Sequence, residues 1–340
     1  MLSVIIVNYN SAGRLVRCIR HLERQTFRDF EIIVFDNASS DASAQAAREN
    51  GAVRVIESAA NLGFAAANNR AAEAAKGDWL VFLNPDAYAD EAWLERLVEA
   101  RSRYGDADAF GSTQLNADDP ERIDGAGDVL HAFGIAYRGG FGAPVSQLPE
   151  DGECFSPCAA AAMIRKSAFD ALGGFDERFF CYGEDVDLGL RLRLLGGRAI
   201  QVADARVLHE GSGVTGRHSA FTVYHGHRNR IWLARKNFPA AFFWGALPMR
   251  LLTDIALLIR MMLIGEARAY LRAMRDGYFG GGPIRSLGRE FRRSMKPGLM
   301  EFLSMMSWSP VALARRAPQI RPATAARAGK ADGVAGFASG

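Results

Sequence analysis

Hydrophobic and polar positions are arranged along the first 110 residues in blocks that predict strands and helices in turn. The run LSVIIVNYN at residues 2–10 is apolar and β-branched until its polar end, as in a strand buried on both faces. The next block, residues 11–25, spaces Leu15, Ile19 and Leu22 along one helical face, with Ser11 placed to cap the helix. Further strands are predicted at 30–39, 53–58 and 78–86, and further helices at 41–50 and 65–76. This alternation predicts an α/β fold built on a parallel sheet with right-handed crossovers.

Three of the predicted strands end in polar residues. These ends are Asn8 to Asn10, Asp36-Asn37 and Asn84-Pro85-Asp86. Such residues are common in turns, so any single strand end has an ordinary structural explanation. In open α/β sheets, however, ligands bind beyond the carboxyl ends of the strands. Three polar ends at one edge of the sheet therefore favour a binding site there.

The periodicity weakens after residue 105. Residues 111–153 are rich in Gly, Asp and Pro, which predicts loops with short strands. Residues 159–175 then indicate a strand that leads into a short helix ended by a Gly-Gly pair. A helix is predicted at 185–195, and the strand after it ends at His209. The second half thus departs from the regular alternation of the first.

The composition is that of an ordinary globular protein, with 49% hydrophobic and 23% charged residues among 340. Four cysteines are too few for a disulfide scaffold, and Cys154 and Cys158 lack the second Cys/His pair that a zinc site needs. The N-terminal segment has no cationic region followed by a long apolar stretch, so we interpret it as a strand and not as a signal peptide. A reducing cytoplasm fits these features.

Charge is unevenly distributed along the chain. The net charge is +3, yet residues 250–340 hold 15 Lys and Arg against 6 Asp and Glu, or +9, which leaves −6 on residues 1–249. A basic C-terminal third on an acidic body predicts an anionic partner, either a membrane or nucleic acid. Because the basic segment has no nucleic-acid-binding motif and no aromatic stacking pattern, no nucleic acid is expected as a partner.

The segment RFFCYGEDVD at residues 178–187 places three acids, Glu184, Asp185 and Asp187, directly behind an aromatic run. In the first turn of a helix, carboxylates interact favourably with the helix dipole, which is a sufficient structural explanation for one or two of them. It does not explain why an aromatic segment carries them. A carboxylate at the edge of an apolar pocket has a raised proton affinity, which suits a general base near neutral pH.

Six segments resemble, in the same order, the family-two glycosyltransferases of the GT-A fold. They are VIIVNYNS, VFDNASSD, NLGFAAANN, VFLNPDA, GGFDERFFCYGEDVDLGLRL and HEGSG. The likeness covers residues 1–240 and is greatest to bacterial rhamnosyltransferase-like enzymes of surface-polysaccharide assembly. It implies a nucleotide-sugar-binding, Rossmann-like mixed sheet flanked by helices. We expect a catalytic domain at 1–225, with a nucleotide-binding half at 1–110 and an acceptor half at 111–225.

The resemblance also implies which residues bind the donor. Asp36 would bond the base of a nucleotide, and Asn8 and Asn61 would line the same pocket, with the NLGFAAANN loop closing over ribose and phosphate. Asn84 is also expected to contact the nucleotide sugar. For Arg191, a phosphate contact and an ordinary surface position stay equally open.

A divalent metal is implied by the same likeness. Asn84-Pro85-Asp86 stands where the family usually has Asp-x-Asp, so Asp86 would carry the carboxylate contact and Asn84 is at best a neutral oxygen ligand. His209 matches the family's additional metal ligand, although a lone histidine after a strand is more often structural. Mg²⁺ or Mn²⁺ suits carboxylate and phosphate oxygens, and Mn²⁺ also accepts an imidazole.

The acids of residues 184–187 acquire a role from the resemblance. Asp185 matches the family's catalytic base, and Glu184 would support the acceptor hydroxyl. The carboxylate would remove the acceptor's proton as its oxygen attacks the anomeric carbon in line. A single displacement inverts the stereochemistry and needs no covalent intermediate.

Residues 226–310 are predicted to be helical. The segment 242–264 is long enough to span a bilayer, but Arg250, Asp254 and Arg260 interrupt it, which favours a helical hairpin lying in the membrane interface. The side chains expected to insert are Phe242, Trp244, Met261 and Met262. Those expected to meet anionic headgroups are Arg268, Arg272, Arg275, Arg289, Arg292, Arg293 and Lys296. A helical subdomain packed on the catalytic body is the alternative, and residues 311–340 are expected to form a disordered tail.

These features predict an inverting, metal-dependent glycosyltransferase attached peripherally to the cytoplasmic face of the cell membrane. It would move a sugar from a nucleotide donor to a lipid-linked saccharide or polysaccharide acceptor, and the family likeness suggests L-rhamnose from dTDP-rhamnose. A galactosyl, galactofuranosyl or mannosyl transferase using a UDP- or GDP-sugar stays open. A catalytically silent nucleotide-sugar-binding subunit is disfavoured because Asp86 and Asp185 are both present.

Overall fold

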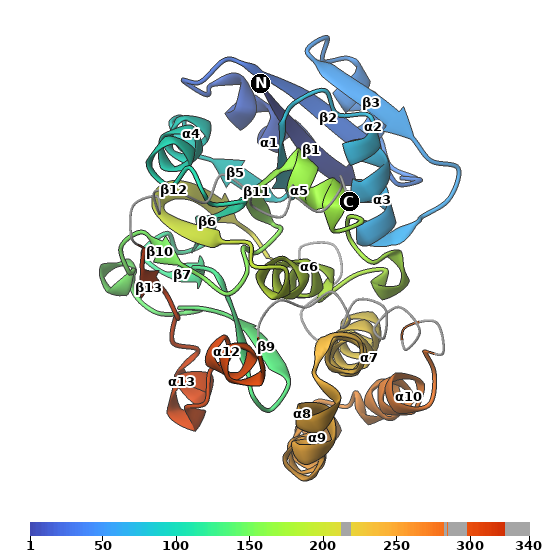
Figure 1. Cartoon of the computed structure of the whole chain (residues 1–340). Coiled ribbons are helices and arrows are strands. Elements are labelled where there is room, and N and C mark those ends of the chain that lie inside the picture. The colour runs from blue at the N-terminus through green and yellow to red at the C-terminus, as the bar shows by residue number, and fades with distance from the viewer. Residues whose placement is uncertain (212–218, 282–283, 285–297, 324–340) are drawn as a thin grey trace.

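A large mixed sheet, flanked by helices, fills the upper part of the molecule (Figure 1). A computed structural model of the protein describes residues 1–211, 219–281, 284 and 298–323. The strands of the sheet, in spatial order, are β13 (Arg321–Pro322), β10 (Gly152–Glu153), β12 (Ala199–His209), β6 (Ala109–Asn116), β11 (Ala161–Arg165), β4 (Trp79–Leu83), β1 (Leu2–Asn8), β2 (Phe30–Asp36) and β3 (Val53–Glu57). Strand β5 (Ala87–Ala89) pairs with β12, and β7 (Ile123–Gly125) pairs with β6.

The first half of the chain has the alternation that the sequence predicts. Strands β3, β2, β1 and β4 are mutually parallel, and helices α1 (Gly13–Glu23), α2 (Ser43–Arg48) and α3 (Gly63–Glu73) connect them. The stripe Leu15, Ile19 and Leu22 is buried in the core beneath α1, as predicted. The predicted cap is wrong, because Ser11 donates its hydroxyl hydrogen bond to the Asn8 side chain and Ala12 occupies the cap position.

The second half adds antiparallel pairs and makes the sheet mixed. Strand β11 runs antiparallel to both β4 and β6, whereas β12 runs parallel to β6. The antiparallel pair of β12 and β5 sets His209 opposite Ala87. Helices α4 (Trp93–Arg103) and α5 (Lys166–Ala171), two 3-10 turns (Val145–Gln147 and Glu177–Phe179) and a separate ribbon of β8 (Asp128–His131) and β9 (Ile135–Arg138) complete this half. The GT-A type mixed sheet predicted from the sequence is thus present.

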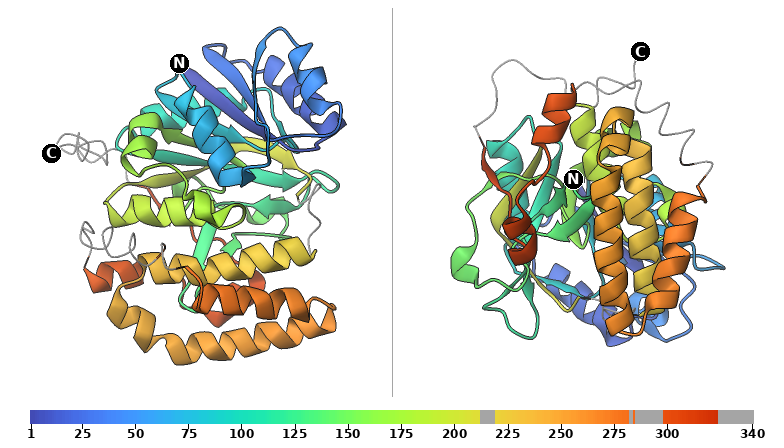
Figure 2. Two further views of the ribbon diagram at one scale, coloured as in Figure 1. Left: turned by 90° about the vertical axis from the view of Figure 1, so that its right-hand side faces the viewer. Right: turned by 90° about the horizontal axis from the view of Figure 1, so that it is seen from below.

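Helix α6 (Glu184–Leu194) lies between the sheet and α7 (Ala220–Asn237), as Figure 2 shows. It is buried on nearly all sides and carries a charged network at its junction with α7. Asp187 accepts hydrogen bonds from Arg191 Nε at 2.8 Å, Lys236 Nζ at 2.8 Å and Asn237 Nδ2 at 2.7 Å. Lys236 Nζ also donates to Asp176 at 2.7 Å. The network joins α6, α7 and the turn before the acids into one rigid unit.

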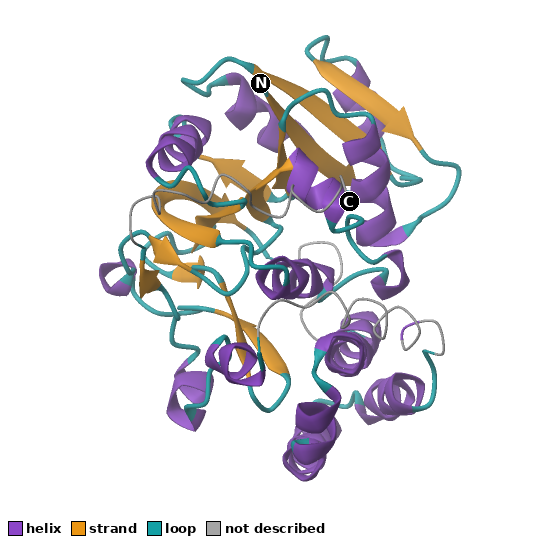
Figure 3. Cartoon of the chain, in the orientation of Figure 1, coloured by secondary structure: helices purple, strands orange, loops and turns teal. Residues whose placement is uncertain are grey.

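The lower part of the molecule is helical (Figure 3). Helices α8 (Ala240–Gly245), α9 (Leu247–Leu263) and α10 (Ala267–Tyr278) follow α7, and α12 (Leu299–Ser304) and α13 (Pro310–Arg315) lie beside the β8–β9 ribbon. No helix among the described residues has the length and apolar character needed to cross a bilayer.

Two side chains expected to insert into a membrane are instead packed inside. Met261 is buried beside Val223 and Tyr270, because it lies on the inner face of α9. Phe242 is half-buried against Phe238 and Phe302. Of the predicted basic contacts, Arg289, Arg292, Arg293 and Lys296 lie outside the described residues.

The expectation of a disordered tail from residue 311 is wrong for residues 311–323. These form most of α13 and then β13, which pairs antiparallel with β10 at the edge of the sheet. Pairing with β10 satisfies backbone hydrogen-bonding groups of this segment. The amino-acid composition of the segment does not reveal that pairing. Residues 324–340 lie outside the described part.

The buried network predicts a strong effect of removing its lysine. Lys236→Met keeps the length of the side chain but leaves Asp187 and Asp176 buried with less positive charge beside them. We expect the free energy of unfolding to fall by about 3 kcal/mol or more, measured by denaturant unfolding. Lys166→Met is the matched control, because Lys166 pairs with Asp170 at the surface, and it should cost about 0.5 kcal/mol or less. Equal losses in the two variants would contradict this account.

Candidate active site

The carboxyl ends of β1 and β2 are tied together by one buried side chain. Asn8 donates from Nδ2 to Asp36 Oδ1 at 2.7 Å and to Ser43 Oγ at 2.8 Å, while its Oδ1 accepts from Ser11. Because Asn8 is fully buried and its amide is engaged, it positions Asp36 and the start of α2. The structure therefore places Asn8 behind the expected nucleotide pocket rather than on its surface.

A second polar set fixes the loop before α3 to the end of β2. Asn37 donates to Asn61 Oδ1 at 2.9 Å and accepts from the Leu62 amide at 2.8 Å, and the Gly63 amide donates to Asn61 Oδ1 at 2.9 Å. Asn61 is exposed beside this set, whereas Asp36 is buried next to Asn8. The sequence indicates Asn37 only as part of a polar strand end and predicts no role for it, since an Asn after a strand is an ordinary turn residue.

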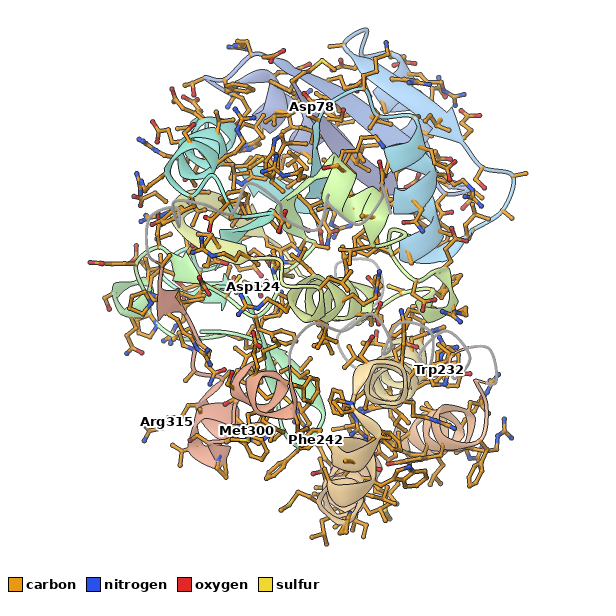
Figure 4. All side chains as sticks on the ribbon, in the orientation of Figure 1. Asp78, Asp124, Trp232, Phe242, Met300 and Arg315 are labelled. Carbon is orange, nitrogen blue, oxygen red and sulfur yellow. The ribbon has the colours of Figure 1, made fainter. Side chains whose placement is uncertain are left out.

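The expected metal residues meet because of strand pairing. Asp86 directly precedes β5, and the β5–β12 pair brings His209 beside it, with His209 Nε2 at 3.4 Å from Asp86 Oδ1. The other ring nitrogen, Nδ1, lies 2.7 Å from Asp124 Oδ2. Arg138 in turn forms an ion pair with Asp124. Figure 4 shows Asp124 in the middle of the molecule, beside the sheet.

The charge state of His209 follows from these neighbours. Burial by itself would lower the pKa of His209, but the hydrogen bond to Asp124 and the proximity of Asp86 outweigh it and raise the pKa to about 9. His209 Nε2 is buried and makes no hydrogen bond among the described residues. A metal ion bound between His209 Nε2 and the Asp86 carboxylate would give this buried nitrogen a partner.

The residues fit a divalent metal. Asp86 offers a carboxylate oxygen and His209 an imidazole nitrogen, with Asp124 holding the opposite ring nitrogen as second partners of metal-binding histidines do. Asn84 is half-buried at the end of β4, and its backbone amide donates to Ala160 O at 2.9 Å. One carboxylate and one imidazole make an incomplete protein site, so a bound metal would take further oxygens from a substrate or water.

A second acidic group lies at the start of α6. Asp185 accepts from its neighbour Val186 N at 2.8 Å and from Ala159 N at 3.3 Å. Burial raises the pKa of Asp185, and the two backbone amides oppose that rise. A carboxylate in this environment remains a hydrogen-bond acceptor and binds a proton more readily than it would in water. These are the properties of a general base.

Asp185 has acidic neighbours that hold protons more tightly. Oxygens of Asp128 and Asp185 and the sulfur of Cys158 all lie within 4.8 Å of one another. Burial and then the Asp185 charge raise the pKa of Asp128 well above its usual range. Burial and Asp185 likewise raise the pKa of Glu184, whose side chain is buried at the start of α6. Asp128 is thus an acidic neighbour of Asp185 that the sequence did not suggest.

Arg138 connects the two acidic groups. It pairs with Asp124 beside His209. Its positive charge also opposes the rise that burial causes in the pKa values of Asp128 and Asp185. Sequence reasoning missed Asp124, Asp128 and Arg138 because they lie in the segment 111–153, which it assigned to loops. Their only signal was charged residues set among glycines and small apolar residues in IDGAGD and AYRGGF.

The aromatic run in front of the acids orients their helix. Phe180, Tyr182 and Gly183 have φ values of 64°, 73° and 83°, which are costly for the two aromatic residues and so require support from their surroundings. Asn229 supplies it by donating to the carbonyls of Phe179, Cys181 and Tyr182 at 2.7–2.9 Å. The strained turn therefore aims the start of α6, with Asp185, toward Asp128.

Two of the residues near the acids are structural. Arg191 donates to Asp187, to Leu172 O at 2.6 Å and to Gly174 O at 2.8 Å, and it is buried. With its guanidinium engaged inside the protein, Arg191 is not placed to contact a phosphate, which corrects that expectation. Asp187 belongs to the same internal network and does not join Asp185.

Solved structures share this arrangement of strands and helices. GalNAc-T7 with UDP, GalNAc and Mn²⁺ matches with a TM-score of 0.60 at 19% identity, over 73% of this chain and 50% of that one. The mannosyltransferase PcManGT of Pyrobaculum calidifontis, in complex with GDP-Man and Mn²⁺, matches with a TM-score of 0.54 at 19% identity, over 86% of this chain and 85% of that one. At this level of identity the likeness concerns the fold, which is that of GT-A glycosyltransferases.

Sequence relatives identify the family. Residues 3–173 match glycosyl transferase family 2. The N-acetylglucosaminyl-diphospho-decaprenol L-rhamnosyltransferase of Mycobacterium tuberculosis is 31% identical over 310 residues, which cover 81% of this chain and 95% of the relative. The O-antigen biosynthesis protein RfbC of Myxococcus xanthus is 37% identical over 164 residues, 44% of this chain and 12% of that protein. The chain belongs to glycosyl transferase family 2, and it is a glycosyltransferase.

The position of Asp124 predicts an effect on metal affinity. Asp124→Asn removes the charge that holds His209 Nδ1, so Mn²⁺ affinity in the presence of dTDP should fall by about 10- to 100-fold. Electron paramagnetic resonance of free Mn²⁺ during a titration measures this affinity. Asp118→Asn, which alters an exposed carboxylate in the loop before β7, should leave it unchanged. An Asp124→Asn variant that folds and binds Mn²⁺ as tightly as the natural chain would show that Asp124 does not support a metal ligand.

Proposed function

We propose that the protein is an inverting, metal-dependent glycosyltransferase that moves L-rhamnose from dTDP-rhamnose to a lipid-linked saccharide at the cytoplasmic face of the membrane. The observation that carries the proposal is the pair of acidic groups connected by Arg138. One group, Asp86 with His209 and Asp124, fits a divalent metal, and the other, Asp185 with Asp128, fits a general base. A metal-dependent nucleotide-sugar transferase that inverts configuration uses both.

The donor would lie along the ends of β1, β2 and β4. Asp36 and Asn61 are proposed to contact the nucleotide, held in place by Asn8 and Asn37. Asp86 and His209 would hold Mg²⁺ or Mn²⁺ against the diphosphate, with Asn84 nearby. When bound, the metal neutralises charge on the leaving nucleoside diphosphate.

Asp185 is proposed to take the proton from the acceptor hydroxyl. As the acceptor oxygen forms its bond to the anomeric carbon, the bond to the diphosphate oxygen breaks on the opposite face of the sugar, and the proton passes to the Asp185 carboxylate. Burial and the charge of Asp185 raise the pKa values of Asp128 and Glu184, which favours the protonated forms of these two groups as hydrogen-bond donors beside the base. This placement would limit the negative charge around the carboxylate that receives the acceptor proton.

The substrate assignment rests on relationship and not on a named specificity contact. The mycobacterial relative is an L-rhamnosyltransferase whose name gives a lipid-linked acceptor, N-acetylglucosaminyl-diphospho-decaprenol. Its alignment with this chain extends over most of both proteins. We also propose the division into a catalytic part at 1–225, a helical region at 226–310 that meets the membrane, and a terminal segment after it.

Donor binding tests the proposal directly. Calorimetric titration with dTDP-rhamnose, UDP-glucose, UDP-galactose, UDP-galactofuranose and GDP-mannose, each with and without Mn²⁺, should give one metal-dependent binder, dTDP-rhamnose. Asp86→Ala should weaken that binding by about tenfold or more, because it removes the carboxylate proposed to hold the metal. Binding of a UDP- or GDP-sugar alone would assign the alternative donor. If no donor bound under either condition, the transferase proposal would fail.

A change at the base should separate binding from chemistry. Asp185→Asn keeps the shape of the side chain but cannot accept the proton, so transfer should fall by about 10²- to 10⁴-fold while donor affinity stays within twofold. Radiolabel transfer to a lipid-linked acceptor and calorimetry measure the two quantities. Asp170→Asn, a surface carboxylate on α5, is the matched control and should leave both unchanged. Retained transfer in Asp185→Asn would exclude Asp185 as the base.

A further inference from the structure

Helix α9 presents an apolar face to the outside of the molecule. Its outward side chains are Leu252, Ile255, Ile259, Met262 and Leu263, which recur every three or four residues along one side. They are among the most exposed apolar residues described, with 63% of Leu252 and 83% of Leu263 accessible. A soluble helix ordinarily turns such a stripe toward the core.

Two charged residues in the first half of α9 point the other way. Arg250 and Asp254 are only 3% and 8% exposed, respectively, on the inner face of the helix. Asp254 accepts from Tyr278 Oη at 2.6 Å and pairs with Arg230 of α7, while Tyr270 Oη donates to the Asp254 carbonyl at 3.0 Å. Arg250 donates to the Phe243 carbonyl.

Helix α9 therefore buries Arg250 and Asp254 together with Met261 on its inner face, while its other face exposes apolar side chains. Of the three charges that argued in the sequence against a membrane span, Arg250 and Asp254 are removed from the outer surface by folding, and Arg260 stays exposed. Between Leu247 and Ile259 the exposed side of the helix carries no charged side chain.

Neighbouring segments extend this surface at the same end of the molecule. Trp244, just before α9, is 66% exposed, and Met300, Trp308 and Val311 are exposed on and around α12 and α13. The Trp308 ring lies 6.1 Å from that of Phe242, which connects the two parts. Figures 1 and 2 show α9, α12 and α13 at the end farthest from β1 to β3, and Figure 4 labels Met300 there.

Exposed positive charge borders the apolar surface. Arg260 is exposed near the end of α9, and Arg268 and Arg272 are exposed on α10. The nearest acidic side chains, Glu266 and Asp276, are partly covered, and Asp276 is engaged by Arg275 at 2.8 Å. An apolar strip with tryptophan and a rim of arginine matches the interface of a bilayer, where acyl chains lie beneath anionic headgroups.

We propose that the outer face of α9, with Trp244 and the rim of Arg260 and Arg268, inserts into the interfacial layer of an anionic lipid bilayer. A bilayer is favoured over a second copy of the chain because the apolar side chains of α9 are edged by like charges, Arg260 and Arg268, that would repel in a self-paired contact. Since no described helix can span, α9 lies in the plane of the membrane surface.

This contact rests on the proposed function, which places the protein at the membrane, and it would be the contact that holds the protein there. Helix α7 separates α9 from α6 (Figure 2), so the membrane lies on the same side of the sheet as the α6 acids. A saccharide carried on a membrane lipid would then approach Asp185 from the side of the lower helices. Vesicle binding is measured without donor or acceptor, so its failure is distinguishable from failure of the transferase proposal.

The test is co-sedimentation of the full chain with vesicles of phosphatidylcholine containing phosphatidylglycerol. We expect binding at low salt, with weaker binding to pure phosphatidylcholine. Leu252→Gln with Ile259→Gln should weaken binding to both by at least about tenfold, since both side chains leave the acyl region. Arg260→Gln with Arg268→Gln should weaken binding to the anionic vesicles by about tenfold and leave neutral vesicles unaffected.

Matched controls fix the interpretation. Arg20→Gln with Arg24→Gln removes the same charge from exposed positions at α1, on the far side of the molecule, and should bind anionic vesicles like the natural chain. Donor calorimetry on every variant verifies that the catalytic part is folded. The proposal would be overturned if the natural chain did not co-sediment with the vesicles. It would also be overturned if the Leu252→Gln, Ile259→Gln variant bound them as strongly as the natural chain. Dimerisation in analytical ultracentrifugation that the same two substitutions abolish, without vesicle binding, would assign the face to self-association instead.

Discussion

The site depends on keeping several carboxylates close together inside the protein. Asp86 and Asp124 flank His209, and Asp128 lies against Asp185. Buried negative charges repel one another and lose hydration, so they persist only with positive charge, shared protons or hydrogen bonds beside them. Arg138, the His209 imidazolium and the amides that hold Asp185 provide that compensation. A bound divalent metal would take the place of the proton on His209 Nε2 and supply the positive charge beside Asp86.

A separate charged network keeps this arrangement in place. Asp187 follows Asp185 by two residues on α6, yet its oxygens are fully occupied by Arg191, Lys236 and Asn237. The pKa of Asp187 is lowered, although burial acts to raise it, because Lys236 and Arg191 stabilise its charge. Neighbouring acids on one helix thus divide into a structural anion, Asp187, and the proposed base, Asp185, according to which elements pack against each of them.

The helical region shows the same division on a larger scale. Arg230, Tyr270 and Tyr278 draw Asp254 inward, and this leaves the opposite side of α9 apolar. Internal polar bonding therefore creates an external apolar surface. If that surface lies on a bilayer, the sheet with its donor residues stands away from the lipid, and α6 lies between the two.

The sequence by itself determined the alternating strands and helices of the first half, the polar strand ends and the family, because each of these rests on local periodicity or on motifs read in order. It also pointed to Asp86, Asp185 and His209 through those motifs. Only the tertiary structure showed that Asp124, Asp128 and Arg138 join them, since strand pairing and the β8–β9 ribbon bring together residues far apart in the chain. Only packing decided that Arg191 is internal, that Asn8 acts behind Asp36, and that Arg250 and Asp254 turn inward. Burial and partner choice are properties of contacts between elements, and a local pattern does not specify them.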